Sequence, residues 1–170
     1  IRPVSDEDNL DYEENQDYVA SGTIDGYDYV DLGLPSGLKW ATCNVGASLI
    51  YEIGDLYAWG ELEPGLDYSP KNLNDISGNP KYDVATVKWS SNWRMPTESE
   101  IKELLLCCSC EWVNVGSCYG YKVIGPNGNS VFFPESPKYG EFYYWGSTSI
   151  SYSGVGVDGA VGIGALTTLF

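Results

Sequence analysis

The clearest helix start in the sequence lies in Trp93-Arg94-Met95-Pro96-Thr97-Glu98-Ser99-Glu100-Ile101. Pro96 fixes its own φ and favours an extended conformation for the preceding residue, so a strand or loop should end here. Thr97 can accept a hydrogen bond from the amide of Glu100, and the Glu100 carboxylate can accept one from the amide of Thr97. This capping box predicts a helix that begins at Glu98.

The residues that follow predict how far the helix runs and which face it buries. Ile101, Leu104, Leu105 and Cys108 recur at helical spacing and form one apolar face. We therefore expect a helix from Glu98 to about Cys108 that packs on a core.

Short apolar segments on both sides of this helix predict strands. Before it we expect strands at 27–32, 38–43 and 56–59, followed by a long irregular segment from 61 to about 88. After the helix, strand-like segments stand at 112–113, 119–124, 130–133 and 143–145. Asn127-Gly128 joins two of them and favours a type I′ hairpin turn, because both residues accept a positive φ.

The charge of the chain excludes two classes of partner. Its 170 residues contain 24 acidic and 9 basic side chains, and the net charge is −15. Such a chain cannot neutralise a phosphate backbone and is not attracted to an anionic membrane surface, so we expect no nucleic-acid binding. No apolar run reaches transmembrane length, so we also expect no direct membrane insertion. The sequence has no histidine, which removes the commonest general base and most catalytic zinc sites.

The first 18 residues form an acidic segment. Seven acids stand there against one basic residue, with little apolar content, which is typical of a flexible leader. We expect residues 19–170 to form a single domain. The chain begins with Ile1, and we expect an N-terminal piece to have been removed.

The cysteines leave three alternatives open. There are five, an odd number, at positions 43, 107, 108, 110 and 118. Their spacing lacks the paired knuckles of a zinc site, and the number does not fit a disulfide-rich miniprotein. Packed or free thiols are the favoured interpretation, one disulfide between Cys110 and Cys118 is the second, and a metal site is the third.

Several blocks resemble one family. These blocks are residues 29–47, 54–61, 93–100, 120–130 and 144–148. Together they resemble the Fibrobacter succinogenes major paralogous domain, found in surface proteins of gut Bacteroidetes, which is similar to the C-type lectin-like fold and its formylglycine-generating-enzyme branch. The resemblance covers residues 27–149.

The resemblance implies a fold and a location. The fold is an α+β, C-type lectin-like domain with a small twisted antiparallel sheet, one or two helices and long loops. The location is extracellular, at the cell surface or secreted, and lipid-anchored through the removed segment. The enzyme branch needs a cysteine pair near its C-terminus, and no cysteine follows Cys118, so that chemistry does not carry over. The family usually ends with a Ser-Val-Arg-Pro-like closing strand, whereas the last residues of this sequence are Thr167-Thr168-Leu169-Phe170.

The expected metal and catalytic motifs are incomplete. A lectin-like calcium site needs an amide after the proline of Glu63-Pro64-Gly65 and an Asn after Trp93, where Arg94 stands. No spacing places two carboxylates on one face of a recognisable hydrolase site. We expect no enzyme, no cofactor and no metal.

Aromatic residues are abundant, with 14 Tyr and 6 Trp, and sugars and peptides both dock on such rings. Four tryptophans lie in strand-like blocks and are expected in the core, namely Trp40, Trp59, Trp112 and Trp145. Tyr139, Tyr143 and Tyr152 lie nearer to loops and are the candidates for ligand contacts.

The tail supplies a fourth candidate. Residues 154–163 alternate small and β-branched side chains about Asp158-Gly159, which predicts a hairpin with Asp158 at its exposed tip. We expect it to pack on the segment 143–145, and the competing interpretation is a disordered tail.

The leading hypothesis is a non-catalytic extracellular module that binds a carbohydrate or a protein ligand, or that mediates adhesion. The alternative is a structural or assembly domain of a larger surface structure, such as a pilus or stalk. A hydrolase or modifying enzyme is the third and weakest reading.

Overall fold

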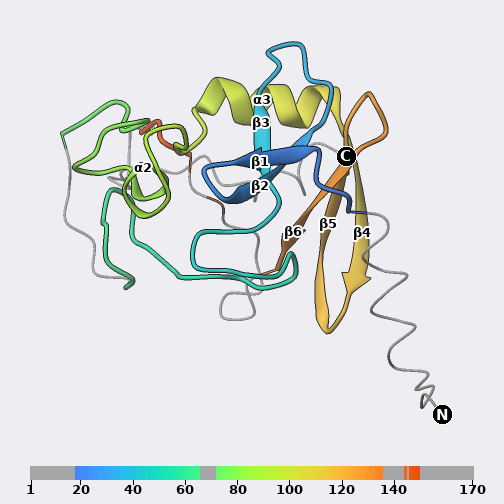
Figure 1. Cartoon of the computed structure of the whole chain (residues 1–170). Coiled ribbons are helices and arrows are strands. Elements are labelled where there is room, and N and C mark those ends of the chain that lie inside the picture. Colours follow the sequence, from blue (N-terminus) through green and yellow to red (C-terminus); the bar gives the residue numbers. More distant parts are fainter. Residues whose placement is uncertain (1–17, 66–71, 136–143, 145, 150–170) are drawn as a thin grey trace, which may run out of the picture.

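The residues that the structure describes form a small α+β fold with two antiparallel three-stranded sheets. The computed structural model describes residues 18–65, 72–135, 144 and 146–149. In Figure 1 the second sheet lies on one side of the molecule and α2 with its surrounding loops on the other, while α3 runs between them along the top. The described residues include no helix long and apolar enough to cross a membrane. Most of the acidic leader and the tail from 150 onward lie outside the described residues.

The first sheet has the order β1-β2-β3. Its strands are Gly22–Ile24, Tyr27–Asp31 and Lys39–Ala41. The last two confirm the strands expected at 27–32 and 38–43, and β1 was not expected. β1 and β2 are joined by Asp25-Gly26, whose φ angles are 49° and 86°, as a type I′ turn requires.

The second sheet is a meander of β4 (Ser109–Val115), β5 (Cys118–Ile124) and β6 (Ser130–Pro134). These strands confirm the segments expected at 112–113, 119–124 and 130–133. The turn between β4 and β5 has two residues, and Gly116 in its first position has a φ of 62°, as in a type II′ turn.

The hairpin at Asn127-Gly128 forms, but its turn is not of type I′. Only Gly128 has a positive φ there, at 87°. The Gly128 amide donates to the Gly125 carbonyl at 2.9 Å, so the tight turn runs from Gly125 to Gly128. Pro126 explains this shift, because its fixed φ suits the second position of an ordinary turn and it has no N–H to donate to the ladder.

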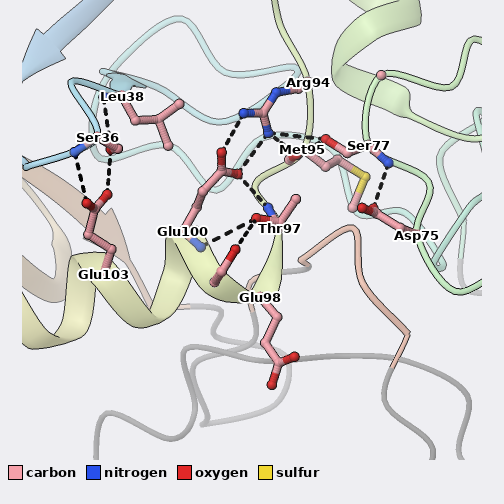
Figure 2. A network of polar contacts seen from close by, with 12 residues as sticks. Ser36, Leu38, Asp75, Ser77, Arg94, Met95, Thr97, Glu98, Glu100 and Glu103 are labelled. Atoms are coloured by element: carbon pink, nitrogen blue, oxygen red, sulfur yellow. Dashed lines mark hydrogen bonds and ion pairs between the residues drawn. The ribbon is translucent and has the colours of Figure 1, made fainter.

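Helix α3 (Glu98–Cys107) begins and is capped as the sequence predicts. The Thr97 amide donates to the Glu100 carboxylate at 2.8 Å, and the Glu100 amide donates to the Thr97 hydroxyl at 3.4 Å. Figure 2 shows Arg94 reaching the same carboxylate, with nitrogen–oxygen distances of 2.8 and 2.5 Å. The start of α3 is therefore held by two capping hydrogen bonds and by the ion pair between Arg94 and Glu100.

Among the described residues, two hydrophobic clusters form the interior. The larger joins both sheets to the buried face of α3, and its buried members are Val30, Leu32, Leu34, Trp40, Ile101, Leu104, Cys108, Val123, Val131 and Phe133. The smaller lies among the loops beside α2 (Val84–Lys88), and its buried members are Tyr57, Trp59, Ile76, Val84 and Met95. Trp40 and Trp59 thus lie in the core, as expected.

The strand expected at 56–59 is wrong. That segment is irregular and ends in a turn closed by the Glu61 amide and the Ala58 carbonyl at 3.0 Å. Tyr57, Ala58 and Trp59 are buried consecutively, whereas a strand with one covered face would alternate. Burial in the smaller cluster, and not strand pairing, explains why this run is apolar.

Asp83 organises the segment expected to be irregular. Its side chain is fully buried, and its carboxylate accepts hydrogen bonds from the amides of Gly78, Thr86 and Met95 at 2.7, 3.1 and 2.8 Å. One of these bonds caps α2. A buried carboxylate needs such donors, so Asp83 joins a turn, a short helix and the approach to α3.

Candidate binding surface on the second sheet

All four contact candidates named from the sequence, Tyr139, Tyr143, Tyr152 and Asp158, lie outside the described residues. The same holds for the tail hairpin and for Trp145. Of the strand expected at 143–145, only Tyr144 is described, and it is not in a strand. Its hydroxyl donates to the Pro134 carbonyl at 3.0 Å and accepts from the Asn44 side chain at 3.1 Å.

The register of the second sheet places other aromatic residues on one face. Trp112 in β4 lies opposite Tyr121 in β5, and Asn114 lies opposite Tyr119. Partners across an antiparallel pair share a face, and so do alternate residues along a strand. The same side of the sheet therefore carries Trp112, Asn114, Tyr119 and Tyr121.

One end of this face is buried in the core, and the other end is exposed to solvent. At the end near α3, Val123, Val131 and Phe133 are buried in the larger cluster. Toward the β4–β5 turn, which projects away from α3 in Figure 1, Trp112 is 48% exposed and Tyr119 is 53% exposed. The expectation that Trp112 lies in the core is therefore wrong, because the hairpin extends beyond the elements that cover its other end.

Three rings form what we call the aromatic ledge, namely Trp112, Tyr119 and Tyr121. The planes of Trp112 and Tyr119 are within 12° of parallel, with their centroids 6.2 Å apart. Tyr121 meets Trp112 edge-on, at 4.9 Å and 72°. Such offset and edge-on arrangements are favourable, so the rings hold one another in place while two of them remain half-exposed.

Polar groups border the ledge on both sides of Tyr119. Asn114 is exposed on β4. On the other side the Glu135 amide donates to the Tyr119 carbonyl at 2.8 Å, which continues the β5–β6 register by one residue. Glu111 lies opposite Lys122, and both residues are on the face of the sheet that does not carry the ledge. By register, Asn114 and Glu135 therefore lie on either side of Tyr119, and the positions between the rings carry no charged residue.

The cysteines do not form the disulfide considered from the sequence. Cys110 lies opposite Val123 and Cys118 opposite Val115, five positions apart, or roughly 17 Å along the ladder. A disulfide requires Cα atoms within about 7 Å, and all five cysteines are free thiols. Burial raises the pKa of the Cys108 thiol to about 11 and also raises the pKa values of Cys43, Cys110 and Cys118. These four thiols are therefore protonated at neutral pH and are weak nucleophiles.

The polar network at the start of α3 is a joint between segments (Figure 2). Arg94 also donates to the Ser77 hydroxyl at 3.2 Å and to the Met95 carbonyl at 3.3 Å. The Arg94 guanidinium, together with the Thr97 hydrogen bonds, lowers the pKa of Glu100 to about 2 against the opposing effect of burial. The charges of Arg94 and Glu100 pair with each other, so the network stabilises the start of the helix and does not offer a reactive group.

The residues at the two incomplete calcium motifs, Glu63 and Arg94, form ion pairs. Glu63 lies 3.3 Å from the ammonium of Lys88, and Arg94 is bound to Glu100. Within the residues that the structure describes, no group of three or more acidic, histidine or cysteine side chains is arranged to hold a metal ion.

Comparison of the chain with protein-family models, with curated proteins and with solved structures gives no match. The candidate surface therefore rests on the geometry of this chain alone.

Proposed function

We propose that this chain is a non-catalytic binding or adhesion module of a bacterial cell surface, with a C-type lectin-like fold, and that the aromatic ledge is its contact surface. The surface location and the fold family rest on the sequence resemblance. The observation that carries the binding role is the pair of half-exposed, nearly parallel rings of Trp112 and Tyr119.

Energetics support this role for the ledge. Fully burying an aromatic side chain stabilises by about 1.5–3 kcal/mol, and Trp and Tyr are the residues most often found at the centre of binding energy in interfaces. Half of that gain is still available at Trp112 and Tyr119, since about half of each side chain faces solvent. Covering both rings would therefore contribute roughly 1.5–3 kcal/mol to binding without any charge pair.

The available chemistry supports binding more than catalysis. The chain has no histidine, and burial keeps four of its thiols protonated. Basic side chains that would steer phosphate ligands are few, and several are engaged in ion pairs. Carbohydrate or protein ligands at a cell surface remain the partners that fit best.

A structural or assembly domain is the second candidate. In its favour, β4 is the outer strand of the second sheet as far as the described residues reach. An outer strand can accept a strand from another chain by hydrogen bonding along its edge. In that role the contact would run along the backbone of β4, and its dependence on the rings of the ledge would be small.

The test compares a ledge variant with a matched surface variant. Trp112→Ala with Tyr119→Ala should weaken binding to the best ligand in a glycan panel and a panel of purified surface proteins by at least about tenfold. Leu106→Ala, at a residue 83% exposed on α3, should leave it unchanged. Surface plasmon resonance gives both affinities, and circular dichroism checks that each variant is folded. Equal binding by the double variant and the parent chain would contradict the proposal.

A further inference from the structure

We infer that the ligand of the aromatic ledge is a neutral carbohydrate, which stacks on Trp112 and Tyr119 and binds without calcium. This inference rests on the proposed function and names the class of ligand for the same surface.

The ring geometry supports a flat ligand with an apolar face. Trp112 and Tyr119 present nearly parallel planes from adjacent strands, and Tyr121 holds the Trp112 ring edge-on. A pyranose carries C–H groups on one face and hydroxyl groups around its rim. Its C–H groups are attracted to the negative face of an aromatic ring, while the hydroxyls remain free to reach groups at the border of the ledge.

The border of the ledge supplies those groups. The side-chain amide of Asn114 can donate and accept, and the carboxylate of Glu135 can accept from hydroxyls. The register places these two residues on either side of Tyr119. Apolar rings bordered by a few polar groups give orientation as well as affinity to a ligand that has both kinds of surface.

The charges favour a neutral sugar over an acidic one. Glu135 borders the ledge, and the whole chain carries a net charge of −15. A sialylated or uronic-acid sugar would be repelled by both, at short range and at long range. A neutral sugar meets no such penalty and can still use the carboxylate as an acceptor.

Calcium is not required by this arrangement. The described residues contain no cluster of acidic or thiol side chains that could hold the ion, and the ledge needs only ring contacts and hydrogen bonds. Binding should therefore survive chelation, unlike that of a site in which calcium holds the sugar hydroxyls.

The experiment uses the whole chain and four kinds of immobilised probe, which are neutral plant and microbial oligosaccharides, sialylated and uronic-acid oligosaccharides, a basic peptide, and a panel of purified surface proteins. We expect binding to neutral oligosaccharides, with the same affinity in chelator and at low and high salt, because no ion pair is involved. Ligand addition should also change the fluorescence of the exposed tryptophan.

Single variants then assign the binding to the ledge. Trp112→Ala and Tyr119→Ala should each weaken the neutral glycan contact by about tenfold, Trp112→Phe should weaken it less because a ring remains, and Leu106→Ala should not change it. If Trp112→Ala does not fold, Tyr119→Ala and Asn114→Ala carry the same test.

The outcomes separate this inference from the proposed function. If the ledge binds only acidic glycans, the basic peptide or a purified protein, and Trp112→Ala abolishes that contact, the carbohydrate inference is wrong and the binding role stands. If neutral glycans bind equally well to the Trp112→Ala and Tyr119→Ala variants, the ledge is not the site and both proposals fail. Absence of any ligand in every class also overturns both.

Discussion

Among single residues, Glu100 makes the contacts that fix the start of α3. Its carboxylate accepts from the Thr97 amide and from both terminal nitrogens of Arg94. The capping contact was predictable, since its partners are three residues apart and its geometry follows from the start of any helix. The Arg94 contact was not, because it depends on how the chain turns at Pro96.

The Glu100 carboxylate should make the stability of the fold depend on pH in the acidic range. Its pKa is lowered from 4.5 to about 2, so the stabilisation is fully present above pH 4.5 and is lost as the pH falls toward 2. We expect the thermal midpoints of the parent chain and of Glu100→Gln to differ at neutral pH and to converge between these two values. Leu106→Ala, at an exposed residue of α3 whose side chain does not titrate, is the control, and any difference that it makes should not vary between these pH values. A difference that stays constant down to pH 2 would contradict this role.

At the scale of elements, the turns decided which predictions succeeded. Strands between local turn signals were predictable, and two further signals of the same kind are present in the sequence. Asp25-Gly26 closes the β1–β2 hairpin, and Gly116-Ser117 closes β4–β5. The second of these sets the register that places Trp112 opposite Tyr121, so the ledge could have been found by pairing the strands across that turn.

The contact between β5 and β6 depends on a glycine. A Cβ added at Gly120 would lie 2.3 Å from the Phe133 carbonyl oxygen and 2.4 Å from the Phe132 ring. We expect Gly120→Ala to destabilise the chain by about 1–3 kcal/mol, as overpacking of a core does. Urea unfolding measures the change, and Ser117→Ala at the exposed turn should have little effect. An unchanged midpoint for Gly120→Ala would show that the two strands separate more easily than this contact indicates.

For the molecule as a whole, the sequence predicted the fold class correctly. It predicted few of the contacts between segments that are far apart in the chain. An α+β chain with antiparallel strands was expected and is confirmed. The contacts that join its parts were hidden, because they link segments far apart in the chain. The Asp31 carbonyl accepts from the Asn127 and Asn129 side chains at 2.8 Å, and the Ser147 carbonyl and amide join Ile76 to Pro96 at 3.0 and 2.7 Å.

The meander of the second sheet has a consequence for the order of folding. Each of its pairings joins neighbours in sequence through a short turn, so little chain entropy is lost in closing them. Contacts such as Asp31 with Asn127 close far longer loops. We therefore expect β4, β5 and β6 to associate first during refolding, and in pulsed hydrogen exchange the β5 amides should gain protection before those of β2. Simultaneous protection of both strands would contradict this order. The surface proposed to bind the ligand would then be the first part of the molecule to fold and the last to unfold.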